Sequence, residues 1–319
     1  MLRLHLTVAD LARVVVRAVP DPLLEAQYAM RALRGGTDER LRRRYHRLVD
    51  HGLGGALRPA LCLVSVYGYT PDFLTPVTGH HGDLDAGIEA VRATPRHRLR
   101  ADLAGVRDTA YSRRLADGDP AALTALTRGL RTAYEAFVAP EADQAARRIA
   151  AERAARVRDL TEEGLHRMLG SLCRDIVWRP PVLELTCPVD SGDGDLHLGG
   201  RGIVLQPTFV GRDAMITAGA DGPLVLSYPV ADPAEGAADG AVADGLADAL
   251  GRTRSRVLAA VRYGATTSQI AGRLGISAAS ASEHARVLRR ARLVTTRRLG
   301  PATLHTLTPL GHALLDGHI

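Results

Sequence analysis

Arginine and serine side chains are concentrated between Ser277 and Arg298, at spacings that suit contact with a polyanion. Arg286 and Arg290 are four residues apart and would share one face of a helix, while Arg297 follows after a change of pattern. A guanidinium group carries five N–H donors and stays charged, so it binds phosphate oxygens and can also take two acceptor atoms of one guanine base. The chemistry to be expected of this stretch is therefore the recognition of phosphates and base edges rather than the making of bonds.

Two predicted helices joined by a tight turn would hold these side chains. Thr266 fits an N-cap with Gln269 three residues later, which is the capping-box pattern. Gly275 fits the left-handed residue after a helix end, and Ser277 can cap a following helix from about 278 to 291. Two helices separated by a short turn that contains a glycine predict a helix-turn-helix.

The second of these helices has a predicted inside and outside. A rotation of about 100° per residue gives an inner stripe of Ala281, His284, Ala285 and Leu288. The opposite face then holds Ala279, Ser282, Glu283, Arg286 and Arg290. For His284 we favour packing or hydrogen bonding over a base contact. The pattern next alternates at 295–298 and again at 302–307, around a Leu-Gly-Pro turn, which predicts a β-hairpin, or wing.

This segment resembles the winged helix-turn-helix of ArsR-type bacterial transcriptional regulators. The resemblance lies in TTSQIAGRLGIS, in S-x-S-E-H-A-R-V-L from Ser280 to Leu288, and in Leu293-Val294 followed by basic residues. It covers roughly a fifth of the chain. Two features depart from the family pattern: the tip of the wing is not basic, and no cysteine box lies in the helix that begins near Thr267.

The resemblance implies that the helix from about 278 enters the major groove of double-stranded DNA and that the wing touches the backbone or the minor groove. It implies a homodimeric regulator, a repressor by expectation, that reads a palindromic operator with half-sites about 34–36 Å apart. The residues expected to contact DNA are Ser277, Ala279, Ser280, Ser282, Glu283, Arg286, Arg290, Arg297 and Arg298. Two alternatives stay open: an enzyme, or a protein-interaction module, that uses the winged helix for targeting.

Charge is unevenly placed along the 319 residues. From Arg252 to the end there are eleven arginines against two acidic residues, whereas residues 1–251 carry 30 basic and 33 acidic residues. This concentration of positive charge favours a nucleic-acid partner for the C-terminal part. All 41 basic residues are arginine, and the absence of lysine excludes a P-loop lysine or a Schiff-base mechanism.

No enzyme motif accompanies this pattern. The sequence holds no G-x-S-x-G, no H-E-x-x-H and no glycine-rich dinucleotide loop after a strand. We therefore expect no catalytic residues, no cofactor and no bound metal. Three groups of residues carry side chains that can bind a metal, and each lacks a complete ligand set: His80, His81, Asp83 and Asp85; His312 and Asp316; Asp190, Asp193 and Asp195.

The chain is long enough for two domains. We expect an α+β effector and dimerisation domain at 1–228, a linker rich in Ala, Gly, Asp and Pro at 229–245, and the winged helix-turn-helix at 246–319. The fold class is mainly α with small β: the first domain is helical, with a helix from about 7 to 19 and a small antiparallel sheet. It resembles an uncharacterised domain that precedes winged helices in high-GC bacteria, with cues in VADLARV, YTPDFLTP, GGRGIVLQP and LGRTRSRVL.

A small-molecule effector is the expected ligand of this first domain. The apolar, proline-broken segment from Leu57 to Thr78 contains three aromatic residues and can line a pocket, or else complete the core. The candidate ligand-binding residues are Tyr67, Tyr69, Phe73 and Trp178. Three isolated cysteines are expected to be reduced and mostly buried, and no run is long and apolar enough for a membrane span, which favours a cytoplasmic protein.

Overall fold

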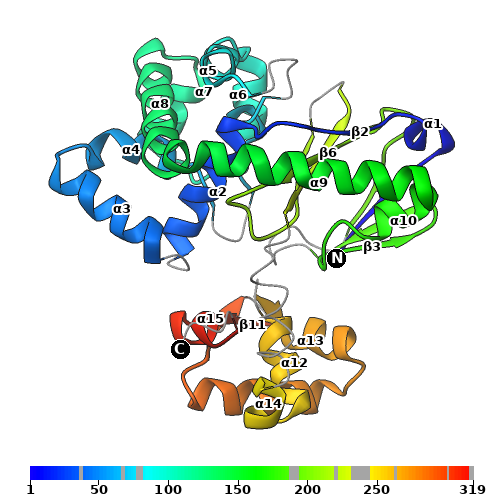
Figure 1. The fold of residues 1–319 in the computed structure, drawn as a ribbon. Helices are drawn as coiled ribbons and strands as arrows, with labels where there is room; N and C mark the ends of the chain where they lie inside the picture. The colour runs from blue at the N-terminus through cyan, green and yellow to red at the C-terminus, as the bar shows by residue number, and fades with distance from the viewer. Residues whose placement is uncertain are drawn as a thin grey trace. The chain divides into compact units, whose positions relative to one another are not determined.

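The computed structural model describes residues 1–35, 39–65, 69–76, 82–186, 194–218, 222–230, 245–261, 264–299 and 302–315. These residues form two compact units, an N-terminal unit that ends at Val230 and a C-terminal unit formed by the residues after it (Figure 1). Helices and strands contribute to both units, so the predicted α+β class is confirmed. The predicted linker at 229–245 lies mostly outside the described residues.

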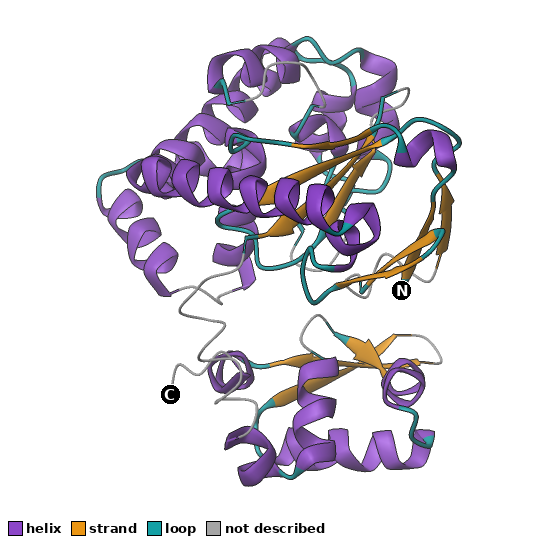
Figure 2. Cartoon of the chain, turned by 45° about the vertical axis from the view of Figure 1, so that its right-hand side comes forward, coloured by secondary structure: helices purple, strands orange, loops and turns teal. Residues whose placement is uncertain are grey.

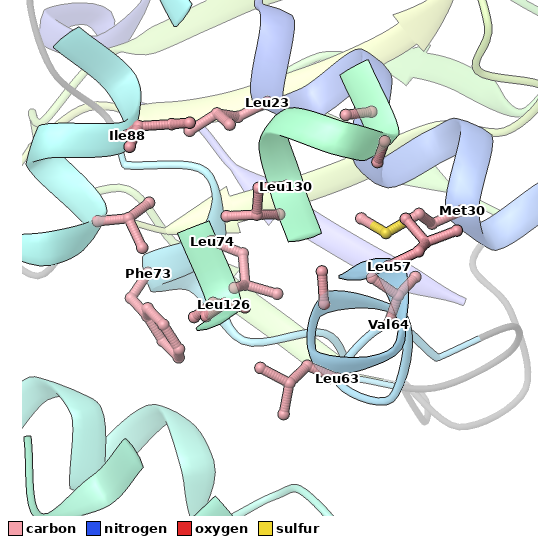
Figure 3. Packing of buried hydrophobic residues seen from close by; sticks show 14 of the residues in the cluster. Leu23, Met30, Leu57, Leu63, Val64, Phe73, Leu74, Ile88, Leu126 and Leu130 are labelled. Atoms are coloured by element: carbon pink, nitrogen blue, oxygen red, sulfur yellow. The ribbon is translucent and has the colours of Figure 1, made fainter. Parts of the chain in front are cut away.

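Helices make up the first half of the N-terminal unit. They are α2 (Pro22–Gly35), α3 (Glu39–Asp50), α4 (Gly54–Leu61), η1 (Asp72–Leu74), α5 (Leu84–Arg92), α6 (Arg96–Leu103), α7 (Ala110–Ala116), α8 (Pro120–Ala133), η2 (Tyr134–Val138) and η3 (Ala139–Glu141). Leu126 and Leu130 of α8 are four residues apart and both buried, so they face the same core (Figure 3). Gly129 lies between them, and a Cβ there would meet the Ala56 carbonyl at 2.9 Å, which lets α8 and α4 pack closely.

The N-terminal unit also contains two four-stranded sheets (Figure 2). The first has the order β3 (Ile176–Arg179), β4 (Val182–Leu185), β1 (Leu2–His5), β5 (Gly194–His197). The second has the order β2 (Val14–Val16), β6 (Ile203–Thr208), β8 (Leu224–Pro229), β7 (Met215–Ala218). The prediction of a small antiparallel sheet is correct only in part, because both sheets are mixed. The pairs β3–β4, β4–β1 and β7–β8 are antiparallel, whereas β1 pairs with β5 in parallel and β2, β6 and β8 are parallel to one another. The many helices between β2 and β6 supply the long connection that a parallel pair needs.

The predicted helix from about 7 to 19 is also corrected. Thr7 caps a helix with a full capping box, but that helix, α1, spans only Val8–Leu11. The Asp10 carboxylate is buried and accepts the Gly202 backbone N–H at 2.9 Å. This bond ties α1 to the start of β6, and the β-branched run Val14–Val16 then joins the sheet as β2.

A buried carboxylate links α2 to the loop after β6. Glu25 accepts the backbone N–H of Phe209 at 2.7 Å with one oxygen and that of Val210 at 2.8 Å with the other. Burial raises the pKa of Glu25 to about 7, although these two hydrogen bonds oppose the shift. Three residues on, the Tyr28 hydroxyl lies 2.8 Å from Ser227 Oγ on β8. Polar contacts as well as apolar ones therefore hold α2 against the second sheet.

The long helix α9 (Ala142–Glu162) crosses the second sheet beside β6 and is followed by α10 (Gly164–Gly170) (Figure 1). Its charged residues are not all on a solvated face. Arg156 lies 3.0 Å from carboxylate oxygens of both Glu152 and Asp159, and it donates to the Ser171 carbonyl at 2.7 Å. This mostly buried ion-pair group joins α9 to the end of α10.

The C-terminal unit begins with a helical segment at 245–250. Then follow α12 (Arg252–Ala260), β9 (Ala265–Thr266), α13 (Thr267–Leu274), α14 (Ala278–Arg290), β10 (Val294–Leu299), β11 (Ala302–Leu307) and α15 (Pro309–Leu315). The strands form one sheet in the order β10-β11-β9. The helices pack on this sheet through a separate hydrophobic core that includes Val257, Ile270 and Leu288. The predicted order, a helix-turn-helix followed by a hairpin, is confirmed.

Candidate nucleic-acid interface

The turn between α13 and α14 is built by the residues that the sequence predicts. The Thr266 hydroxyl accepts the Gln269 N–H at 3.3 Å, and the Gln269 side chain accepts the Thr266 N–H at 2.8 Å. Gly275 ends α13 with φ at 65°, a conformation that a side chain would disfavour. Ser277 then caps α14 by accepting the Ser280 N–H at 3.1 Å. These caps set where α14 begins and therefore which of its residues face outward.

One side of α14 is buried against the rest of the unit. Ala281, Ala285 and Leu288 are at most 1% exposed, and His284 at the edge of the same stripe is partly exposed. Alanines at this contact let α13 approach α14 closely, because they have no side chain beyond Cβ. The predicted inner stripe is confirmed for its three apolar members.

The opposite side of α14 is exposed over its whole length. Its exposed residues are Ser277 at the cap, then Ala279, Ser282, Glu283, Arg286 and Arg290, with Ser280 partly buried. Hydroxyl, carboxylate and guanidinium groups thus follow one another along one face. Such a face can donate to and accept from the edges of bases, which display both kinds of partner in the major groove.

Glu283 and Arg286 form a two-point ion pair on this face. Arg286 Nε lies 2.9 Å from Glu283 Oε2, and Arg286 Nη2 lies 2.5 Å from Glu283 Oε1. The hydrogen bond to Arg286 lowers the pKa of Glu283, and the same bond raises the pKa of Arg286. The sequence prediction treated the two residues separately, although their spacing of three residues was a signal that they could meet.

The end of α14 turns sharply into the hairpin. Arg292 adopts φ 59°, and its N–H donates to the Arg289 carbonyl at 3.0 Å. The Leu293 N–H donates to the Leu288 carbonyl, also at 3.0 Å. Together these bonds make the Schellman pattern, here with an arginine where glycine is usual. Leu293 is thereby buried while the basic residues before it stay on the surface.

The hairpin is joined to the start of α13 by a histidine that the sequence prediction missed. His305 on β11 is 5% exposed, with Nε2 at 3.0 Å from Thr267 Oγ1 and Nδ1 at 3.1 Å from Thr296 Oγ1. Burial, together with the nearby Arg289, lowers the pKa of His305. The imidazole therefore bridges two hydroxyls and orients the wing. Arg297 and Arg298 on β10 are both exposed.

The described candidates for a ligand pocket do not form one group. Phe73 is buried in the helical core, whereas Trp178 lies on β3, packs against the core of the sheets and donates to His166 at 3.2 Å. Tyr69 is 45% exposed, and Tyr67 lies outside the described residues. A pocket lined by all four residues stays a prediction. Of the cysteines, Cys62 is exposed and Cys173 is partly exposed, which corrects the expectation of buried thiols for Cys62.

Two further kinds of feature, a metal centre and a membrane span, concern the part of the chain that the structure describes. There, no three His, Cys, Asp or Glu side chains gather as they would around a metal ion. Several weighed residues are not described: His80, His81, Asp190, Asp193, the side chain of His312, and Asp316. Within the same ranges no helix combines the length and apolar character needed to cross a membrane.

Comparison of the chain with protein-family models, with curated proteins and with solved structures finds no match.

Proposed function

We propose that this chain is a sequence-specific, DNA-binding transcriptional regulator of ArsR-like type, and a repressor. The observation that carries the proposal is the division of α14 into a buried alanine side and an exposed polar side. A helix supported in this way behind a short turn has the shape and chemistry to enter a major groove. Arg286 is the arginine of this face nearest the start of α14, and it can take a guanine bidentately.

The exposed arginines around α14 support a duplex as the partner. Arg290 lies near the end of α14, while Arg297 and Arg298 follow on β10, and all three are exposed. Guanidinium groups at the edges of a reading helix are suited to phosphates, which position a protein on DNA without reading its sequence. This arrangement fits the concentration of positive charge in the C-terminal part of the sequence.

The wider proposal includes a homodimer on a palindromic operator and a small-molecule effector bound by the N-terminal unit. A two-fold dimer presents two copies of α14 to two half-sites, which raises both affinity and specificity over one copy. The operator lies on genomic DNA, so we place the protein in the cytoplasm. In this proposal the chain uses no catalytic residue, no cofactor and no metal.

Mapping genomic occupancy of the full chain and sequencing the bound fragments tests the proposal. We expect a small number of sites that share an inverted repeat, and tight binding of purified protein to a duplex with that repeat. Arg286→Ala serves as the matched variant, because it changes the reading face and leaves the alanine side intact. Occupancy without a shared sequence would favour a protein-interaction module, and turnover of a bound compound would favour an enzyme.

A further inference from the structure

The ion pair on α14 occupies only one edge of the Arg286 guanidinium. Glu283 takes Nε and Nη2, at 2.9 and 2.5 Å. A guanidinium has five N–H donors in one plane, so Nη1 and the second hydrogen of Nη2 remain on the outer edge. That edge presents two parallel donors, which is the arrangement that O6 and N7 of guanine accept. Arg286 can therefore keep Glu283 and bind a guanine at the same time.

The pair also restricts where the guanidinium can point. An unpaired arginine has several rotatable bonds and can swing from a base to a neighbouring phosphate. Two parallel hydrogen bonds to one carboxylate hold the plane of the group in a single orientation. Both residues belong to α14 itself, so the pair that favours this orientation forms without any partner.

The negative charge of Glu283 also favours contact with a base over contact with a phosphate. From Arg252 to Leu315 it is the only acidic residue in the sequence, and it stands on the face that carries Ser282, Arg286 and Arg290. A carboxylate there repels phosphate and lowers attraction to any duplex regardless of sequence. A cytosine amino group, by contrast, can donate to it. Glu283 thus disfavours contact with the phosphate backbone of DNA and permits contact with bases.

We propose that Glu283 is a specificity-determining residue, which orients Arg286 toward a guanine and makes the alternative contact of Arg286 with phosphate unfavourable. The inference rests on the proposed function and adds to it a division of roles on α14. Arg286 makes the base contact, and Glu283 makes that contact selective. Natural binding surfaces often use such a repulsive element to separate the right partner from the wrong one.

The test uses the full chain in four forms: wild type, Glu283→Gln, Arg286→Ala and the double variant. Selection from randomised duplexes defines the preferred site of the wild type. Binding isotherms at several salt concentrations then compare this site, its single base-pair variants and a scrambled duplex. Asp248→Asn is the matched control, because it removes one exposed negative charge of the C-terminal unit from a different helix.

We expect Glu283→Gln to bind scrambled DNA severalfold more tightly and to lose about tenfold in the ratio of preferred to scrambled affinity. Glu283→Gln should lose its base preference at the same base pair at which Arg286→Ala loses its preference. The salt dependence on scrambled DNA should steepen by about 0.9, the value for one new phosphate contact. When Arg286 is already replaced by Ala, Glu283→Gln should no longer change the preference at that base pair and should add no new phosphate contact.

An unchanged preference in Glu283→Gln, an equal effect in the Arg286→Ala background, or an equal effect of Asp248→Asn would each overturn the inference. Circular dichroism of each variant confirms that α14 is intact, so that lost helix is not read as lost specificity. Failure of the proposed function has a different signature, since the wild type would then select no sequence at all, and the inference would fall with it.

Discussion

At the scale of single residues, the exposed arginines of the C-terminal unit differ in the support they receive. Arg286 is held by Glu283 on the outer face of α14, whereas Arg297 and Arg298 are exposed on a strand. An oriented guanidinium suits a base edge, and an exposed one on a hairpin suits a phosphate. The two classes should therefore respond differently to substitution.

Arg286→Ala should weaken binding to the preferred site by about tenfold or more and should leave scrambled DNA much less affected. Arg297→Ala and Arg298→Ala should weaken both duplexes alike and flatten the salt dependence by about 0.9 for each lost phosphate contact. Isotherms on both duplexes across a salt series measure these effects. If Arg286→Ala behaves like the wing variants, Arg286 contacts the backbone and the reading face is assigned wrongly.

Glu25 makes the stability of the N-terminal unit depend on pH. Burial raises its pKa from 4.5 to about 7, and burial raises the pKa of the neighbouring Asp21 as well. Between the unfolded-state pKa of 4.5 and the folded-state pKa of about 7, the folded state binds more protons than the unfolded state. The free energy of unfolding therefore falls as pH rises from about 5 to 8. The Glu25 contribution is at most about 3 kcal/mol.

Urea unfolding at pH 5, 6, 7 and 8 measures this dependence. Glu25→Gln is less stable at pH 5, because an amide has only one acceptor for the N–H groups of Phe209 and Val210. Its stability should nevertheless change less between pH 5 and 8 than that of the wild type. A free energy of unfolding that rises over this range would contradict the assignment of a buried, mostly protonated carboxyl.

At the scale of elements, the capping box of α13 is a local source of stability. Thr266 and Gln269 satisfy two backbone N–H groups that a helix start would otherwise leave without partners. Thr266→Ala should lower the free energy of unfolding of the C-terminal unit by about 1 kcal/mol. Thr295→Ala is the control: it removes only an exposed side-chain hydrogen bond to Thr306 on the hairpin, 2.8 Å long, and should cost less, a few tenths of a kcal/mol. Equal losses in chemical denaturation would show that the cap is not the cause.

The C-terminal elements were predictable because their signals are local. A cap, a left-handed glycine and a stripe of alanines lie within a few residues of the helix ends that they define. Val14–Val16 was misread because short apolar runs suit a helix as well as a strand. What makes it a strand is pairing with Ile203–Leu205, far along the chain, and the bond from Asp10 to Gly202. The β-branched run itself favours a strand, but no residue near 14 indicates which segment it pairs with.

The candidate site was predictable to the same degree. The outward residues of α14 follow from its period, so the exposed face was found from sequence. The contacts of His305 were not, because they depend on the register that places β11 beside Thr266 and opposite β10. Glu25 was missed for a similar reason, since its partners lie in a loop that only the folded sheet brings to α2.

At the scale of the whole molecule, each unit has its own hydrophobic core. The N-terminal unit holds a helical cluster and a sheet cluster, and the C-terminal unit holds a third cluster. Units with separate cores gain most of their stability from within. We therefore expect two unfolding transitions in calorimetry of the full chain. Raising the pH from 5 to 8 should destabilise the N-terminal unit, where the pKa of Glu25 is raised, and should not destabilise the C-terminal unit, where the pKa of His305 is lowered. Thr266→Ala should lower only the transition of the C-terminal unit. A single transition lowered by both changes would contradict this view.

The parallel pairing of β2 with β6 has a consequence for synthesis on the ribosome. Residues 1–16 leave the exit tunnel long before their partner strands, which are made only from residue 182 onward. The helices from α4 to α8 have partners close in sequence and can collapse while the rest is still being translated. Residues 1–16 must therefore remain unpaired until those strands have been made. Pulse-labelled hydrogen exchange during refolding should show amides of α8 protected before those of Val14–Val16, so a segment that is made before α8 is placed after it.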